Sequence, residues 1–115
     1  YYKLGEKGYA YADVRLMTPE GEKADAAVGD GPVDASLKAV ERVVGLPISL
    51  KVYQIAAIPA WKHPLGEATL KVEYNGRLYH GRGISTDIVK SSVNAYINAV
   101  NSVFLAMELE QQEEE

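Results

Sequence analysis

The chain has 115 residues, 47% of them hydrophobic, which is enough for one globular domain with a buried core. Its formal net charge is −4, and its 12 Lys and Arg residues are scattered, which argues against a nucleic-acid-binding surface. The absence of Cys excludes a disulfide framework, a thiolate nucleophile and a cysteine metal site, and it is compatible with a cytoplasmic protein.

The two ends of the chain have the composition of exposed segments. Residues 1–8 show no clear period and are expected to be the remnant of a linker, as if the chain began inside a longer protein. The acidic run 108–115 is expected to be a solvated tail, which leaves 9–107 as the folded domain. No apolar run approaches the roughly 20 residues of a bilayer span, and no secretory leader is visible, so we expect no membrane partner.

The first predicted elements are two strands joined by a turn. Apolar and polar residues alternate over 9–16, which is the period of a half-buried strand. The segment Thr18-Pro19-Glu20-Gly21 has the residue types of a tight turn, and a second strand follows over 22–28. Small residues recur on one face of this second strand, which predicts the close approach of another element there. They are Ala24, Ala26 and Val28.

A glycine-rich corner, Gly29-Asp30-Gly31-Pro32-Val33-Asp34-Ala35, precedes the first predicted helix. Pro32 suits the first helical turn because its missing N–H would have no partner within the helix, and Asp34 would complement the helix dipole. The helix is predicted to begin near Gly31 and to end at a C-cap at Gly45. Its apolar stripe consists of Val33, Leu37, Val40 and Val44.

The middle of the chain predicts a long strand, a loop and a hairpin. Residues 48–58 alternate until the phase changes near Gln54, which predicts a bulge or bend. The loop 59–66 contains Trp61, which either covers the core or belongs to a contact surface. The dipeptide Asn75-Gly76 lies between two alternating runs and is the strongest short hairpin signal.

A second glycine corner, Gly81-Arg82-Gly83-Ile84-Ser85-Thr86-Asp87-Ile88, precedes a long helix. Ser85 or Thr86 can cap this helix, and an apolar stripe of about five turns follows. Gly31 and Gly83 are 52 residues apart, so the chain reads as a duplication. We predict an α+β fold of internally duplicated strand-strand-helix units, with a mainly antiparallel sheet and helices packed on one face. A single Gly-x-Gly is commonly only a tight corner, but two together would form a small anion-binding pocket.

These corners, together with the strand segment 50–58 and the helical run 92–101, resemble the C-terminal regulatory domain of the 2-isopropylmalate synthase and citramalate synthase family. The likeness covers about 9–104. It implies a domain that forms a homodimer and binds leucine or isoleucine, the end product of branched-chain amino acid biosynthesis, near the dimer interface. Binding would inhibit a separate TIM-barrel catalytic domain by feedback.

The resemblance also implies an effector-binding site. An amino acid needs an anion site, a cation site and an apolar slot. Free N–H groups at a helix start suit the carboxylate, and backbone carbonyls or Asp34 suit the ammonium. Asp34 could equally serve only the helix dipole, and Leu50 and Leu70 could be plain core. The implied site residues are Gly31, Pro32, Val33, Asp34, Leu50, Tyr53, Ala57, Pro59, Ala68, Leu70 and Ile84.

The resemblance implies that catalysis lies outside this chain. In the family, a divalent metal held by a His-x-His pair activates a 2-oxo acid for condensation with acetyl-CoA, whereas this chain has only His63 and His80. We therefore expect no catalytic residue, metal or cofactor here. Leucine is weakly favoured as effector. The alternatives are the isoleucine-binding domain of a citramalate synthase, and an assembly module of the same family with no effector bound.

Overall fold

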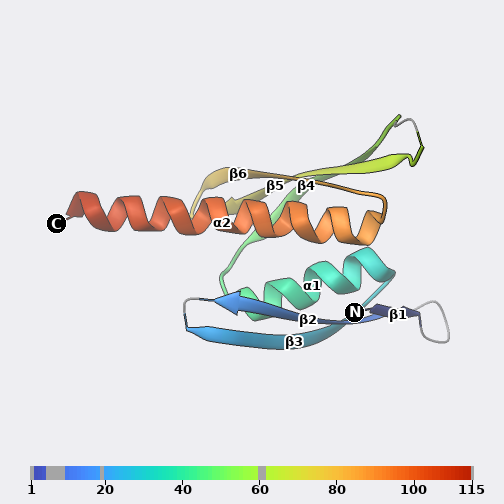
Figure 1. The fold of residues 1–115 in the computed structure, drawn as a ribbon. Helices are drawn as coiled ribbons and strands as arrows, with labels where there is room; N and C mark the ends of the chain where they lie inside the picture. Colours follow the sequence, from blue (N-terminus) through green and yellow to red (C-terminus); the bar gives the residue numbers. More distant parts are fainter. Residues whose placement is uncertain (1, 5–9, 19, 60–61, 115) are drawn as a thin grey trace. The chain divides into compact units, whose positions relative to one another are not determined.

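The computed structural model describes residues 2–4, 10–18, 20–59 and 62–114, and these form two compact units, Tyr1–Leu46 and Pro47–Glu115. Each unit contains a three-stranded antiparallel sheet and one helix (Figure 1). The predicted α+β class, with antiparallel strands and helices, is confirmed. The sequence indicated one domain with a single sheet, whereas the strands form two sheets.

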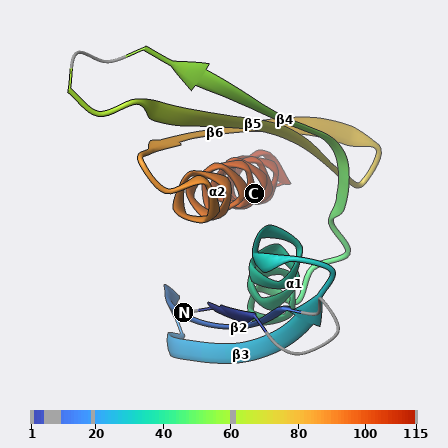
Figure 2. The same cartoon turned by 90° about the vertical axis from the view of Figure 1, so that its right-hand side faces the viewer.

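The first unit consists of three strands followed by a helix. Strand β1 falls within the segment that the sequence pattern led us to describe as a linker remnant, and it pairs antiparallel with β2. The sheet order is β1-β2-β3, and α1 lies on one face of this sheet (Figure 2). The bounds are β1 (Tyr2–Leu4), β2 (Ala10–Thr18), β3 (Gly21–Gly29) and α1 (Pro32–Val44).

The core of the first unit is built from small residues. Ala10 and Ala12 of β2 are buried with Ala35 of α1. On β3, the pairing of Ala12 with Ala27 places Ala27 on the buried face. The predicted buried face of Ala24, Ala26 and Val28 is therefore wrong, and Val28 is 58% exposed. Small residues occur in both phases of this strand, so alternation alone could not identify its inner side.

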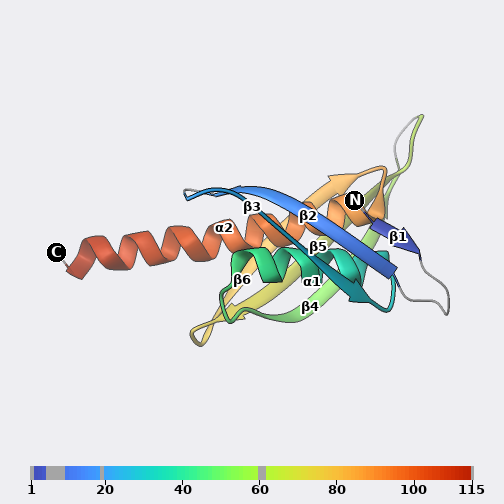
Figure 3. The same ribbon diagram turned by 90° about the horizontal axis from the view of Figure 1, so that it is seen from below.

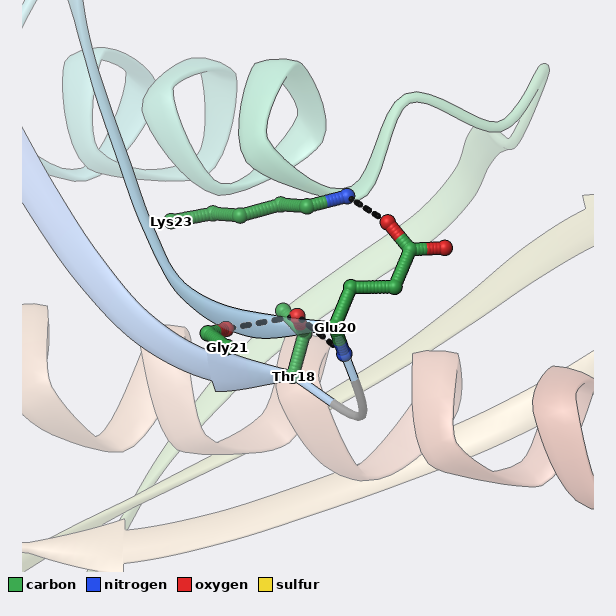
Figure 4. Close-up of polar contacts among 4 residues, drawn as sticks. All are labelled: Thr18, Glu20, Gly21 and Lys23. Carbon is green, nitrogen blue, oxygen red and sulfur yellow. Dashed lines mark hydrogen bonds and ion pairs between the residues drawn. The ribbon is translucent and has the colours of Figure 1, made fainter.

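The turn between β2 and β3 is held by side-chain contacts (Figure 4). The Thr18 hydroxyl donates to the Gly21 carbonyl oxygen at 2.7 Å and accepts from the Glu20 N–H at 3.2 Å. Gly21 has φ +110°, a conformation that side chains disfavour. The Lys23 ammonium lies 2.7 Å from the Glu20 carboxylate and holds the pKa of that carboxyl below its ordinary 4.5. The predicted turn is confirmed.

The second unit repeats the order of three strands and a helix, with sheet order β4-β5-β6. Helix α2 lies on one face of this sheet and continues past its edge (Figures 1 and 3). With 27 residues it is about 40 Å long, and it includes most of the run 108–115 that was predicted as a tail. The bounds are β4 (Ser49–Ile58), β5 (Leu65–Tyr74), β6 (Arg77–Ser85) and α2 (Ile88–Glu114).

Three local predictions in this unit can be compared with the structure. The hairpin at Asn75-Gly76 is confirmed, and both residues have positive φ, 54° and 81°. The register shift in β4 lies between Leu50 and Val52, a few residues before the expected position at Gln54. Trp61 lies outside the described residues.

No helix in the described ranges has the length and apolar character needed to cross a membrane.

Asp87 caps the second helix. Its Oδ1 accepts from the N–H of Val89 at 2.8 Å and from that of Lys90 at 3.4 Å. Ser85 instead accepts from the Asp87 N–H at 3.1 Å, so the prediction of Ser85 or Thr86 as the capping residue is wrong. The helix begins later than expected, and the carboxylate meets the orphan N–H groups at its positive end.

Helix α2 packs very closely against two glycines of β6. A Cβ added at Gly81 would collide with the Ala95 carbonyl oxygen, and one added at Gly83 would collide with the carbonyl oxygen of Ser91. Gly81 and Gly83 therefore lie within a strand, beneath the helix, and not at a strand-to-helix corner. Their requirement for glycine comes from helix packing, which corrects the interpretation of this Gly-x-Gly as a copy of the first corner.

The two units repeat with an offset of 56 residues, since α1 begins at position 32 and α2 at position 88. In the first unit, Arg42 Nη1 donates to the Ala26 carbonyl oxygen at 3.2 Å. In the second, Asn98 Nδ2 donates to the Arg82 carbonyl oxygen at 2.7 Å. The two donors are 56 residues apart in the sequence, and so are the two acceptors. The structural repeat is thus real, but its register differs from the 52 residues that the glycine pattern suggested.

Candidate functional site

The predicted site residues belong to both units. Gly31, Pro32, Val33 and Asp34 form the start of α1 in the first unit, and the remaining seven lie on or beside the strands of the second unit.

The start of α1 has an open backbone. Gly31 is the N-cap, with extended backbone and no side-chain hydrogen bond to the first turn. Its carbonyl oxygen accepts from the Ala35 N–H at 2.9 Å, which closes the first turn. A Cβ placed on Gly31 would meet no atom within 4 Å. The helix therefore presents the positive end of its dipole beside open space, the arrangement in which a carboxylate is bound well.

Asp34 already has two partners within its own unit. Its Oδ2 accepts from the Asp30 N–H at 2.9 Å and lies 3.0 Å from the Lys38 ammonium. The Asp30 N–H, and then Lys38, hold the pKa of Asp34 below its ordinary 3.8, while Asp34 raises the pKa of Lys38. A Cβ on Gly29 would lie 2.5 Å from this Oδ2, so glycine is needed for the carboxylate to fold back. These contacts favour a structural role for Asp34.

We expect Asp34→Asn to lower the free energy of unfolding near neutral pH by less than about 1 kcal/mol, because the side chain is 42% exposed and the interaction is screened. The pKa is lowered by folding, so the charge stabilises the folded chain above the ordinary pKa, and this contribution disappears as the pH falls through the folded-state value. Urea unfolding at several pH values should show the difference from wild type shrinking as the pH falls below the ordinary pKa of 3.8.

The neighbouring substitution Asp30→Asn is the control, because Asp30 contributes its backbone N–H and keeps it in the variant. A stability difference for Asp34→Asn that is the same at every pH would contradict the role assigned to the carboxylate charge.

Five predicted residues of the second unit share the sheet face on which α2 packs. The cross-strand pairs Leu50 with Val72, and Tyr53 with Leu70, define this face, and the bulge at Lys51 keeps Leu50 on it. Leu70 is 2% exposed and Ala68 is fully buried, so both belong to the core. Leu50 is 43% exposed and Ala57 is also exposed, so the β4 half of this face is largely uncovered.

Tyr53 links β4 to the start of α2. Its hydroxyl lies 2.5 Å from Ser92 Oγ, and Ser92 Oγ in turn donates to the Ile88 carbonyl oxygen at 2.8 Å. Because the serine proton is used in the second bond, Tyr53 is the donor in the first. The pattern of the sequence did not predict this contact, although Ser92 is a buried position of α2. A polar residue at a buried stripe position was the available signal.

The other predicted residues lie elsewhere in the second unit. Ile84 pairs with Glu67 and points to the sheet face opposite that of Leu70, so the structure does not bring it together with the other five. Pro59 is exposed immediately after β4. His63 and His80 are exposed, and the described ranges contain no cluster of three or more His, Cys, Asp or Glu side chains suited to a metal.

Two shallow hollows lie on the second unit. The first, of about 330 Å³, is on the sheet face opposite α2 and includes Val52, Lys71 and His80 in its lining. The second, of about 380 Å³, lies between β6 and α2 and includes Ile84 and Asn94. Of the predicted site residues, Leu70 lines the first hollow and Ile84 lines the second. Neither hollow is therefore lined by the set of residues predicted to form the apolar slot.

Comparison with known proteins identifies similar domains. Residues 3–104 match the family model described as the LeuA allosteric (dimerisation) domain. The chain is 41% identical over 110 residues to a 2-isopropylmalate synthase of Serratia proteamaculans, covering 96% of this chain and 21% of that protein. It is 44% identical over 108 residues to a 2-isopropylmalate synthase of Cronobacter sakazakii, and the match covers 94% of this chain and 21% of that protein. It is 42% identical over 104 residues to a 2-isopropylmalate synthase of Gloeobacter violaceus, and this match covers 90% of this chain and 19% of that protein. The chain thus spans about a fifth of the length of these relatives.

Proposed function

Because this chain belongs to the LeuA allosteric (dimerisation) domain family, we propose that it is the regulatory domain of a 2-isopropylmalate synthase-like enzyme, which binds leucine and assembles with a second copy. The observation that carries this proposal is the match over 3–104, together with synthase relatives about 40% identical over nearly the whole chain. The condensation of a 2-oxo acid with acetyl-CoA then belongs to another part of the longer protein. Allosteric inhibition is a coupling free energy between that part and the effector site.

Each unit offers part of the chemistry that leucine needs. In the first unit, the open start of α1 at Gly31 is the candidate contact for a carboxylate. In the second unit, the uncovered half of the β4 face offers apolar contacts for an aliphatic side chain, at Leu50, Tyr53 and Ala57. Asp34 is assigned the role of holding the corner, because its carboxylate already has two partners.

Leucine should stabilise the folded chain if it binds that state alone. At a free concentration 100 times its dissociation constant, linkage gives about 2.7 kcal/mol of added stability, which thermal unfolding detects readily. Ala57→Phe should abolish this stabilisation because the added ring occupies the space that the effector side chain needs. Ala56→Phe is the matched control, since Ala56 is also exposed but lies on the opposite sheet face. Equal leucine stabilisation of both variants would refute the placement of the effector at β4.

The choice between leucine and isoleucine needs the same measurement with both ligands. A displaced methyl group in an apolar slot changes affinity by only about 1 to 3 kcal/mol, so both are expected to bind, with different midpoints. We favour leucine because the relatives reported above are 2-isopropylmalate synthases. Tighter binding of isoleucine would indicate the citramalate synthase branch of the family.

A second candidate function is assembly without an effector, and particular contacts favour it. Gly81 and Gly83 are required by helix packing, Leu70 belongs to the core, and Asp34 is held by its own unit. Under this candidate the chain forms a dimer but is not stabilised by leucine or isoleucine at millimolar concentration. Thermal unfolding combined with light scattering separates the two functions.

A further inference from the structure

Strand β4 is a long edge strand with almost no charge. Within the described ranges it pairs only with β5, so its other edge has no strand partner. Its one charged residue is Lys51, which lies 3.9 Å from Glu73. The seven residues 52–58 are all uncharged, and most of their side chains are exposed, with Val52 at 39% and Ile55 at 41%. An edge of this kind is a template for pairing with another chain.

The other edge strands are short or protected. Strand β1 has three residues. Arg42 covers the edge of β3 by donating to the Ala26 carbonyl oxygen, and Asn98 covers the edge of β6 by donating to the carbonyl oxygen of Arg82. Of the four sheet edges, β4 therefore combines length with lack of charge.

We propose that β4 pairs antiparallel with β4 of a second copy of this chain, which joins two three-stranded sheets into one of six strands. A second copy is the expected occupant because the chain matches a family of dimerisation domains, and because an uncharged edge is complementary to itself about a two-fold axis. This inference rests on the assembly part of the proposed function and assigns it a surface.

Symmetry fixes the geometry of such a pair. A two-fold axis between antiparallel edge strands is normal to the sheet, so one residue lies opposite its own copy and α2 lies on the same sheet face in both chains. The midpoint of 52–58 is Ile55, which places Tyr53 opposite Ala57. Lys51 then lies opposite Pro59, so like charges do not meet.

The absence of Cys makes single-cysteine variants a direct test. With Ile55 on the axis, Ile55→Cys brings two Cα atoms to about 4.5–5.5 Å, within disulfide range. Val52→Cys is the matched control, because its exposure is similar but its two copies would be about 20 Å apart along the strands. Under mild oxidation of the 115-residue chain, we expect at least about tenfold more disulfide-linked dimer from Ile55→Cys.

A charge variant tests the same surface without a crosslink. Ile55→Lys places two ammonium groups opposite each other, so light scattering should show loss of the dimer, whereas Leu78→Lys, at a 53% exposed position on β6, should leave it intact. If wild type is dimeric but Ile55→Cys crosslinks no better than Val52→Cys, or Ile55→Lys remains dimeric, the surface assignment fails and the proposed function stands. A wild-type chain that is monomeric throughout overturns the assembly proposal as well, and leucine binding, measured separately, then tests the effector part alone.

Discussion

Gly81→Ala and Gly83→Ala should each destabilise the second unit by about 1–3 kcal/mol or more, the cost of overpacking a tight interface. The added methyl group would meet main-chain atoms of α2, at Ala95 and Ser91, which cannot rotate away as a side chain could. Helix and sheet must then separate, and the buried contacts between them weaken. Urea unfolding followed by circular dichroism should give a lower midpoint for both variants.

Gly66→Ala is the matched control for this prediction. Gly66 also lies in a strand on the side facing α2, but its nearest neighbour to a new Cβ is a side-chain atom of Ile88 at 3.5 Å, an ordinary contact. Its effect should be close to zero, since lower entropy of the unfolded chain offsets small adjustments. If Gly81→Ala unfolds at the same urea concentration as Gly66→Ala, the close packing of α2 on β6 is disproved.

Leu70→Ala should lower the free energy of unfolding by about 2–5 kcal/mol, because it removes a side chain that is 2% exposed and leaves a cavity in the core. Leu50 was predicted as part of the same apolar slot but is 43% exposed, so Leu50→Ala should cost far less stability. Denaturant unfolding of the two variants makes the comparison. Similar losses would mean that Leu50 is covered in solution.

Measurements of ligand binding should distinguish Leu50 from Leu70 further. In the proposed effector site, Leu50→Ala should weaken leucine binding while the chain remains folded. Leu70→Ala should affect binding only in proportion to its loss of folded protein, because its side chain is enclosed.

Local chemistry in the sequence predicted most of the elements. Asn75-Gly76 predicted the hairpin because both positions need positive φ. Pro32 predicted the start of α1, and Gly45, with φ 71°, is its C-cap. These signals depend on a few neighbouring residues, so they can be interpreted without knowledge of the tertiary fold.

Features that depend on distant packing were predicted less well. Gly31 and Gly83 look alike in the sequence, but the first begins a helix and the second lies beneath one. The buried face of β3 was misassigned because Ala26 and Ala27 are consecutive alanines that point to opposite faces of the sheet, so residue type does not distinguish the two faces. Which predicted site residues share a face depends on the bulge at Lys51, and alternation places such a bulge only to within a few residues.

The two helix starts differ chemically although the units repeat. Asp87 caps α2 with its carboxylate, whereas Gly31, the N-cap of α1, has no side chain to bond the first-turn N–H groups. A ligand carboxylate would therefore compete with the Asp87 cap at α2, while at α1 it would meet no capping side chain, although the Asp34 carboxylate lies in the same turn. Under the proposed function, we therefore expect each chain to bind one equivalent of effector and not two, despite the duplicated architecture.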